Sequence, residues 1–162
     1  MRHLTVLALR VVIALALAGS LFVQVVMVPL VWADLDGAPE RVRVPFVVIV
    51  VLFVLALQVC GVCVWRLLTM VRRGSVFSDA AFRWVDVVIG AVTAAAVLTF
   101  ALAVVLAPGE EVPPGIVGLL CGAALVIGGV ALVVLVMRML LAQAVDRDVE
   151  ARRLRSELDE VI

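Results

Sequence analysis

The chain has 162 residues, of which 66% are hydrophobic and 16% are charged, and its formal net charge is zero. A soluble domain is about 45–50% apolar and about 25% charged, and a chain of this length buries only about 70% of its surface. The composition therefore excludes an ordinary water-soluble domain, favours an integral membrane protein, and gives no reason to expect direct binding of nucleic acid.

In chain order, four apolar segments are long enough to cross a bilayer as helices, which takes about 20 residues each. The predicted spans are 11–32, 44–65, 87–107 and 116–137. They lack strict alternation, and backbone groups in lipid must be bonded internally, so helices are favoured over barrel strands. The predicted fold is all-α: a polytopic four-helix transmembrane domain over 1–137, arranged as two hairpins, and a charged helical tail over 138–162.

Two amides, Gln24 and Gln58, lie within the first and second predicted spans. At 1.5 Å of rise per residue they lie roughly 20 Å and roughly 12 Å above the inner boundary, an offset that is long for a direct pair unless the helices shift or tilt. We expect each amide to make a single polar contact with backbone or water rather than to form part of a transport site. No ionisable residue lies in the middle of a span, which argues against a pump or coupled carrier.

The second span also contains a Cys-Gly-Val-Cys motif, Cys60 to Cys63, near its inner end. Redox proteins use this spacing to bring two thiols together. Membrane enzymes that make disulfides need such a pair near the oxidising face, with a second pair or a quinone pocket, and only Cys121 remains elsewhere. We expect structural cysteines, with a thiol redox enzyme as the alternative. No metal or cofactor site is predicted.

The connector between the second and third spans, 66–86, carries aromatic residues among its arginines. Ser78 is typical of a helix N-cap, and Phe77 and Phe82 have the spacing of a hydrophobic staple. Phe82 and Trp84 indicate a short helix at the membrane interface. A capped turn that needs no ligand explains this pattern, and part of a docking surface is the functional alternative.

Small residues recur along the third and fourth spans. In the fourth span, Gly118 and Gly122 form a GxxxG motif, and Gly129 extends roughly the same face. In the third span, Gly90 and Ala94 form another stripe of small residues. Small residues let helix backbones approach closely in membranes. We expect packing within the bundle, with a homodimer face as the alternative. A cleft between these two spans also leaves open a binder or facilitator of a small hydrophobic molecule.

The tail after Arg138 mixes charges at helical spacing and carries two apolar stripes. Leu141 and Val145 begin the first stripe. The second stripe contains Leu154, Leu158 and Val161 or Ile162. The stripes do not join into a continuous heptad. A solvated continuation of the fourth helix is one interpretation, and a docking helix recognised through its i, i+4 anchors is the other.

Arginine placement predicts the orientation. Every basic residue is Arg, which we interpret as the codon habit of a GC-rich bacterial genome, and eleven of the 13 lie on one side of the spans. Only Arg41 and Arg43 lie on the other side. The positive-inside rule therefore places both termini and the 66–86 connector in the cytoplasm of a bacterial cell membrane protein.

The four spans, the connector Arg-Arg-Gly-Ser-Val-Phe-Ser and the closing Leu-Arg-Ser-Glu-Leu-Asp-Glu-Val-Ile resemble domain-of-unknown-function family 2975. Phe77 matches the Gly-x-x-Phe theme of that family, and 154–162 matches its terminal theme. The resemblance covers nearly the whole chain and implies a small bacterial four-helix membrane protein with no assigned reaction. Family members are often encoded beside small helix-turn-helix regulators, which would make the cytoplasmic face a docking surface.

The expected function is that of a non-enzymatic interaction or regulatory module. Its connector and tail would bind a cytosolic partner, such as a small helix-turn-helix regulator, because the outer loops are too short to recognise much. The lipid bilayer is the other expected partner, and a homo-oligomer through small-residue helix faces stays open. No cofactor is expected.

Overall fold

The computed structural model describes the chain except at positions 1, 36, 38, 73–78, 109–111 and 162, with side chains described over 7–70 and 82–157 apart from these gaps. The described residues are helical, with short turns between the helices. The elements are α1 (Arg2–Phe22), the π-helical turn η1 (Val23–Met27), α2 (Val28–Asp34), α3 (Glu40–Arg72), α4 (Asp79–Leu106) and α5 (Pro114–Val161).

Four helical segments are long and apolar enough to cross a membrane, which confirms the expected all-α chain with four candidate spans. They are Leu7–Asp34, Glu40–Met70, Phe82–Leu106 and Pro114–Glu157. All four are longer than predicted, and in three of them Arg10, Arg66 or Arg138 lies inside a continuous helix instead of at its end. An arginine with a long apolar stem can extend its charged group toward water without ending the helix.

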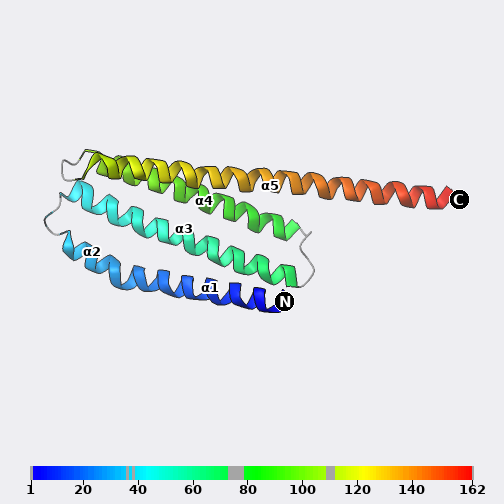
Figure 1. Ribbon diagram of the computed structural model, residues 1–162, viewed down its shortest axis with the longest axis horizontal. Helices are drawn as coiled ribbons and strands as arrows, with labels where there is room; N and C mark the ends of the chain where they lie inside the picture. The colour runs from blue at the N-terminus through cyan, green and yellow to red at the C-terminus, as the bar shows by residue number, and fades with distance from the viewer. Residues whose placement is uncertain (1, 36, 38, 73–78, 109–111, 162) are drawn as a thin grey trace.

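Successive helices pack in chain order and form an open row instead of a closed bundle (Figure 1). α3 packs along α4 and α4 along α5, whereas α1 contacts α3 more sparsely. Within the described part of the chain, α1 and α5 have no extensive contact and lie at opposite edges of the row. Each edge helix therefore has an outer face that the chain itself does not cover.

The interior of the row is thin and built from small side chains. The buried apolar residues of the described chain are Ile13, Cys63, Ala95, Ala103, Ala124 and Ala131. Thr99 is buried as well, and its hydroxyl donates to the carbonyl oxygen of Ala95 at 2.8 Å. Because this bond stays within α4, the hydroxyl needs no partner on another helix. Most large apolar side chains are exposed, as expected where lipid is the solvent.

The first span widens into η1 immediately before Pro29. The N–H of Val28 donates to the carbonyl of Val23, five residues earlier, as in a π-helix. A proline inside a helix lacks an N–H and its ring clashes with the carbonyl four residues earlier, here that of Val25. The wider π-turn accommodates this clash within an otherwise continuous span.

Helix α5 extends well beyond the ends of the other helices (Figure 1). Its 48 residues correspond to about 72 Å at 1.5 Å of rise per residue. Half-buried positions on the side of α4 recur as far as Val145, and the described side chains after it are exposed. We call the exposed part, 146–157, the projecting tail.

Candidate functional site

Three polar side chains meet between α1 and α3 within the spans. Nε2 of Gln58 donates to Oε1 of Gln24 at 2.9 Å and to Oγ of Ser20 at 3.1 Å. Nε2 of Gln24 donates to the carbonyl oxygen of Val51 at 3.4 Å, and the Ser20 hydroxyl donates to that of Leu17 at 2.8 Å. The expectation that Gln24 and Gln58 do not pair directly is therefore wrong.

The first and second spans are shifted along each other relative to the predicted boundaries. Nη2 of Arg10 donates to Oγ1 of Thr69 at 3.0 Å, so Arg10 lies level with Thr69, one turn beyond the predicted inner end of the second span. From that level Gln24 lies about 21 Å and Gln58 about 17 Å along their helices. The reach of two amide side chains closes the remaining difference.

These bonds hold α1 at the edge of the row, where apolar contacts are sparse. Hydrogen bonds between helices in membranes contribute about 0.6 kcal/mol each. Gly61 lies on the same interface: a Cβ atom built there would be 3.3 Å from Cδ2 of Leu17. The polar cluster of Ser20, Gln24 and Gln58 thus holds α1 against α3. The side-chain donors of these three residues form hydrogen bonds within the chain.

One end of the row places arginines over aromatic rings. The guanidinium carbon of Arg10 lies 5.4 Å from the ring centre of Trp65, that of Arg66 lies 5.5 Å from Trp84, and that of Arg138 lies 5.9 Å from Phe82. These distances are within the range in which a cation is attracted to a ring face. We call these six residues the basic end. The basic end brings the predicted interaction residues Phe82 and Trp84 together with arginines of α1, α3 and α5.

Arg138 also joins α5 to α4 where α5 leaves the row. Its Nη2 donates to Oδ2 of Asp86 at 2.7 Å, and its Nε lies 2.5 Å from Oδ1. Both side chains are partly exposed, so the pair contributes at most about 1 kcal/mol. Its two-point geometry sets the position of α5 along α4.

At the opposite end, an arginine closes the turn between α2 and α3. Nη2 of Arg43 donates to the carbonyl oxygen of Trp32 at 2.5 Å, and its guanidinium carbon lies 4.2 Å from the Trp32 ring centre. Arg43, one of the two arginines on this side, therefore stabilises this turn.

Val145 and Leu154, one described member of each apolar stripe predicted in the tail, lie on opposite sides of α5. Val145 and Leu154 are nine residues apart, which is about two and a half turns. Val145 is half-buried toward α4, and Val149 continues its side with 62% of its surface exposed. Leu154 faces away and is 54% exposed. This opposition explains why the stripes do not form one heptad.

Four of the predicted interaction residues lie outside the described side chains: Phe77, Leu158, Val161 and Ile162.

The predicted packing glycines lie on the outer face of α5. Gly118, Gly122 and Gly129 are exposed, and a Cβ atom built at each meets no atom within 4 Å. Gly90 and Ala94 are exposed on α4. Among the described residues, those buried along α4 and α5 are Ala95, Thr99, Ala103, Ala124 and Ala131. Several faces of these helices carry small residues, so spacing alone did not indicate which face packs inside.

The three cysteines are free thiols. Cys63 is only 1% exposed, whereas Cys60 and Cys121 are half-buried. Cys63 is therefore part of the interior of the row. The described residues contain no group of three or more His, Cys, Asp or Glu side chains that could hold a metal ion.

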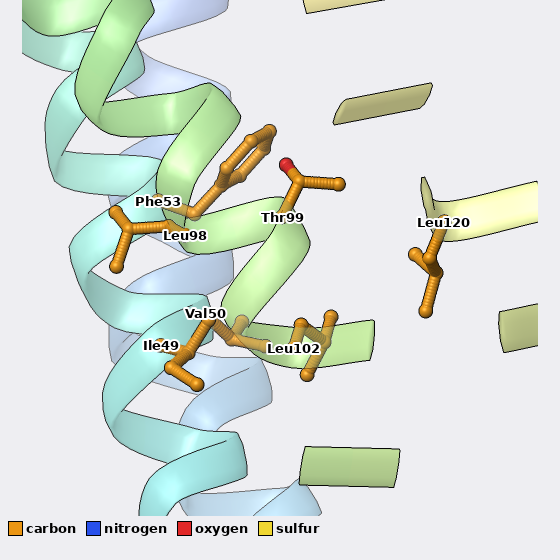
Figure 2. Close-up of a pocket in the computed structure, with 7 residues that line it drawn as sticks. All are labelled: Ile49, Val50, Phe53, Leu98, Thr99, Leu102 and Leu120. Atoms are coloured by element: carbon orange, nitrogen blue, oxygen red, sulfur yellow. The ribbon is translucent and has the colours of Figure 1, made fainter. Parts of the chain in front are cut away.

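An apolar cavity of about 180 Å³ lies between α3, α4 and α5. Its lining residues, shown in Figure 2, are Ile49, Val50 and Phe53 of α3, Leu98, Thr99 and Leu102 of α4, and Leu120 of α5. Leu120 lies apart from the other six lining residues (Figure 2). The Thr99 hydroxyl is already bonded to Ala95. Apolar cavities of about 150 Å³ bind benzene or xenon and stay free of water, so this cavity suits hydrocarbon.

A family model described as "Protein of unknown function (DUF2975)" matches residues 30–162 of the chain. The chain belongs to this family. The resemblance seen in the connector and the closing residues is thereby confirmed. No match was found among curated proteins or among solved structures.

For this member of family 2975, the matched region contains α3, α4 and α5 in full, with most of the basic end and the projecting tail. Sequence reasoning missed Ser20, Thr69 and Asp86 as functional side chains of the fold. Ser20 lies one turn before Gln24, so a signal for the polar cluster was present. Thr69 and Asp86 carried no such signal, because each one's partner lies more than 50 residues away in the chain.

Proposed function

We propose that this protein is a multi-pass bacterial cell-membrane protein, inserted as two helical hairpins with both termini in the cytoplasm. Arginine placement supports this orientation, because Arg10, Arg66 and Arg138 belong to the basic end and Arg83 lies between Phe82 and Trp84 in the chain. Cytoplasmic ends of membrane proteins carry an excess of arginine and lysine.

We further propose that the protein is not an enzyme and that it binds a cytosolic protein in the corner between the basic end and the projecting tail. The observation that carries this proposal is the length of α5. From Val145 to Val161 the helix continues for about 24 Å at 1.5 Å per residue. A helix of this length is marginal in water by itself, and here the span below it keeps it ordered. It holds Val149, which is 62% exposed, in a position where the bilayer does not cover it.

The side chains of this corner indicate the chemistry of the partner. Val145 and Val149 form an apolar strip, and Arg66 and Arg83 are exposed on α3 and α4. Arg83 makes no ion pair within the described part of the chain. A partner that fits would therefore present an apolar ridge with acidic groups next to it. The resemblance to the family adds a class for this partner, a small helix-turn-helix regulator held at the membrane.

Affinity capture from native membranes tests this proposal. We expect a cytosolic protein to be recovered with the full chain, and to be lost after truncation at Arg138 and with Val149→Asp. Leu154→Asp is the matched control, because it places the same charge on the opposite side of the tail. Equal recovery of the protein with both variants would contradict a site in this corner.

A second candidate function rests on the cavity between α3, α4 and α5. Its seven lining residues are apolar except for Thr99, whose hydroxyl is bonded within α4, and this lining supports binding of a small uncharged hydrophobic molecule.

A further inference from the structure

On the outer face of α5, exposed apolar and small residues recur in a row that no other part of the described chain covers, with Arg147 as its charged member. Half-buried positions over 120–145 place α4 on one side of this helix. On the opposite side, Gly118, Val136 and Leu154 follow one another at intervals of 18 residues, about five complete turns. They therefore fall on one line along the helix, and all three are exposed. A second exposed line runs beside it and contains Gly122 and Leu140.

We propose that this outer face binds the same face of a second copy of the chain, and that the two α5 helices lie parallel and in register. Lipid covers the row as far as Val136. Leu154 lies about 24 Å beyond Arg138 at 1.5 Å of rise per residue, in water, where an apolar row needs another cover. Two copies that insert by the same charge rule have the same orientation, so their α5 helices meet in parallel.

The period of the row also suits a contact between two straight helices. A heptad repeat would require left-handed supercoiling, whereas this row repeats with the period of the α-helix itself. Gly118, Gly122 and Gly129 let the backbones approach within the bilayer. The faces therefore stay together from the span into the projecting tail.

Charges beside the row fit a second copy in this arrangement. Glu150 and Arg155 lie on opposite flanks of the row, five residues apart. In a parallel twofold pair, opposite flanks of the two helices meet, and residues at this spacing pair between chains as in parallel coiled coils. Neither residue forms an ion pair within the described part of its own chain. Each can thus pair with its counterpart in the other copy.

Arg147 is the charged member of the row, and it would meet its own counterpart near the twofold axis. Asp146 and Glu150 lie within one turn of it in the chain, so each guanidinium group has carboxylates nearby in its own copy. This local charge balance offsets the repulsion between the two arginines.

Thiol cross-linking in native membranes tests the contact. In a chain with Cys60, Cys63 and Cys121 changed to alanine, we expect Leu154→Cys to give a band of twice the chain mass with a short bifunctional thiol reagent. Ser156→Cys, at the same level on the far side of α5, should give none. Equal cross-linking at both positions, no cross-linking at either, or a product of another mass would overturn the proposal.

A charge exchange tests the register. Glu150→Arg should lower the Leu154→Cys cross-link about tenfold, because it replaces attraction with repulsion at two symmetric contacts. Adding Arg155→Glu to the same chain should restore the cross-link. Arg152→Glu, a charge reversal on the far side, should leave the cross-link unchanged. Failure of the restoration would overturn the in-register arrangement. This face lies opposite Val149, so loss of the cytosolic partner would not affect these results.

Discussion

Polar side chains at particular depths determine how α1 is attached to the rest of the row. Gln58 donates to both Gln24 and Ser20, and Arg10 donates to Thr69 nearer the basic end. In lipid, a polar group without a partner is costly, so these bonds select one sliding position of α1 against α3. Hydrogen bonds between polar side chains thus fix the position of α1 against α3, which the sparse apolar contact between these two helices does not.

Replacing Gln58 with leucine tests this role. Gln58→Leu removes both bonds donated by Gln58 and leaves the Gln24 amide with only its long contact to Val51. We expect the free energy of unfolding to fall by about 1 kcal/mol, measured by detergent titration followed by tryptophan fluorescence. Thr93→Val is the control, because the Thr93 hydroxyl bonds only to Ile89 of its own helix. Equal stability of both variants would show that the cluster does not hold α1.

At the scale of elements, α4 is the helix that joins α3 to α5. It packs against α3 on one side and α5 on the other, and its small buried residues bring α5 close. The cavity remains where Leu120 of α5 stands away from α3 across α4 (Figure 2). The space that could take a hydrophobic molecule therefore results from how three helices meet.

Filling this cavity tests whether it is a binding site. Leu102→Trp places a large ring among the lining residues, and we expect labelling of the lining by a photoreactive hydrocarbon to fall several-fold. Val104→Trp is the matched control, because Val104 is exposed to lipid on the same helix. If the two variants are labelled like the natural chain, the cavity does not hold the probe.

The whole molecule is an open row with chemically different ends. The basic end gathers arginines, aromatic rings and the projecting tail, whereas the opposite end has short turns and acidic residues such as Asp34 and Glu40. α5 runs along one edge of the row and extends beyond its basic end (Figure 1). Orientation in the bilayer thus decides which compartment meets the tail.

Reporter fusions test this orientation. Alkaline phosphatase is active only outside the cytoplasm, so we expect a fusion after Ile162 to be inactive and a fusion after Gly37, between α2 and α3, to be active. A fluorescent protein that matures in the cytoplasm should give the opposite result at the same two sites. Phosphatase activity at Ile162 would contradict the proposed orientation and, with it, a cytosolic partner.

By itself, the sequence determined the helical class, the number of candidate spans, the uneven placement of arginine and the family resemblance. These properties depend on local composition: about 20 apolar residues span a bilayer whatever surrounds them. Only the tertiary structure decided that Gln24 meets Gln58, that Arg138 meets Asp86, and that Gly118 faces outward while Ala124 faces inward. A lipid-embedded helix is apolar on every side, so its hydrophobic pattern does not distinguish an inner from an outer face. The rotation of each helix and its sliding against its neighbours therefore follow from packing and from a few polar contacts, which link residues far apart in the chain.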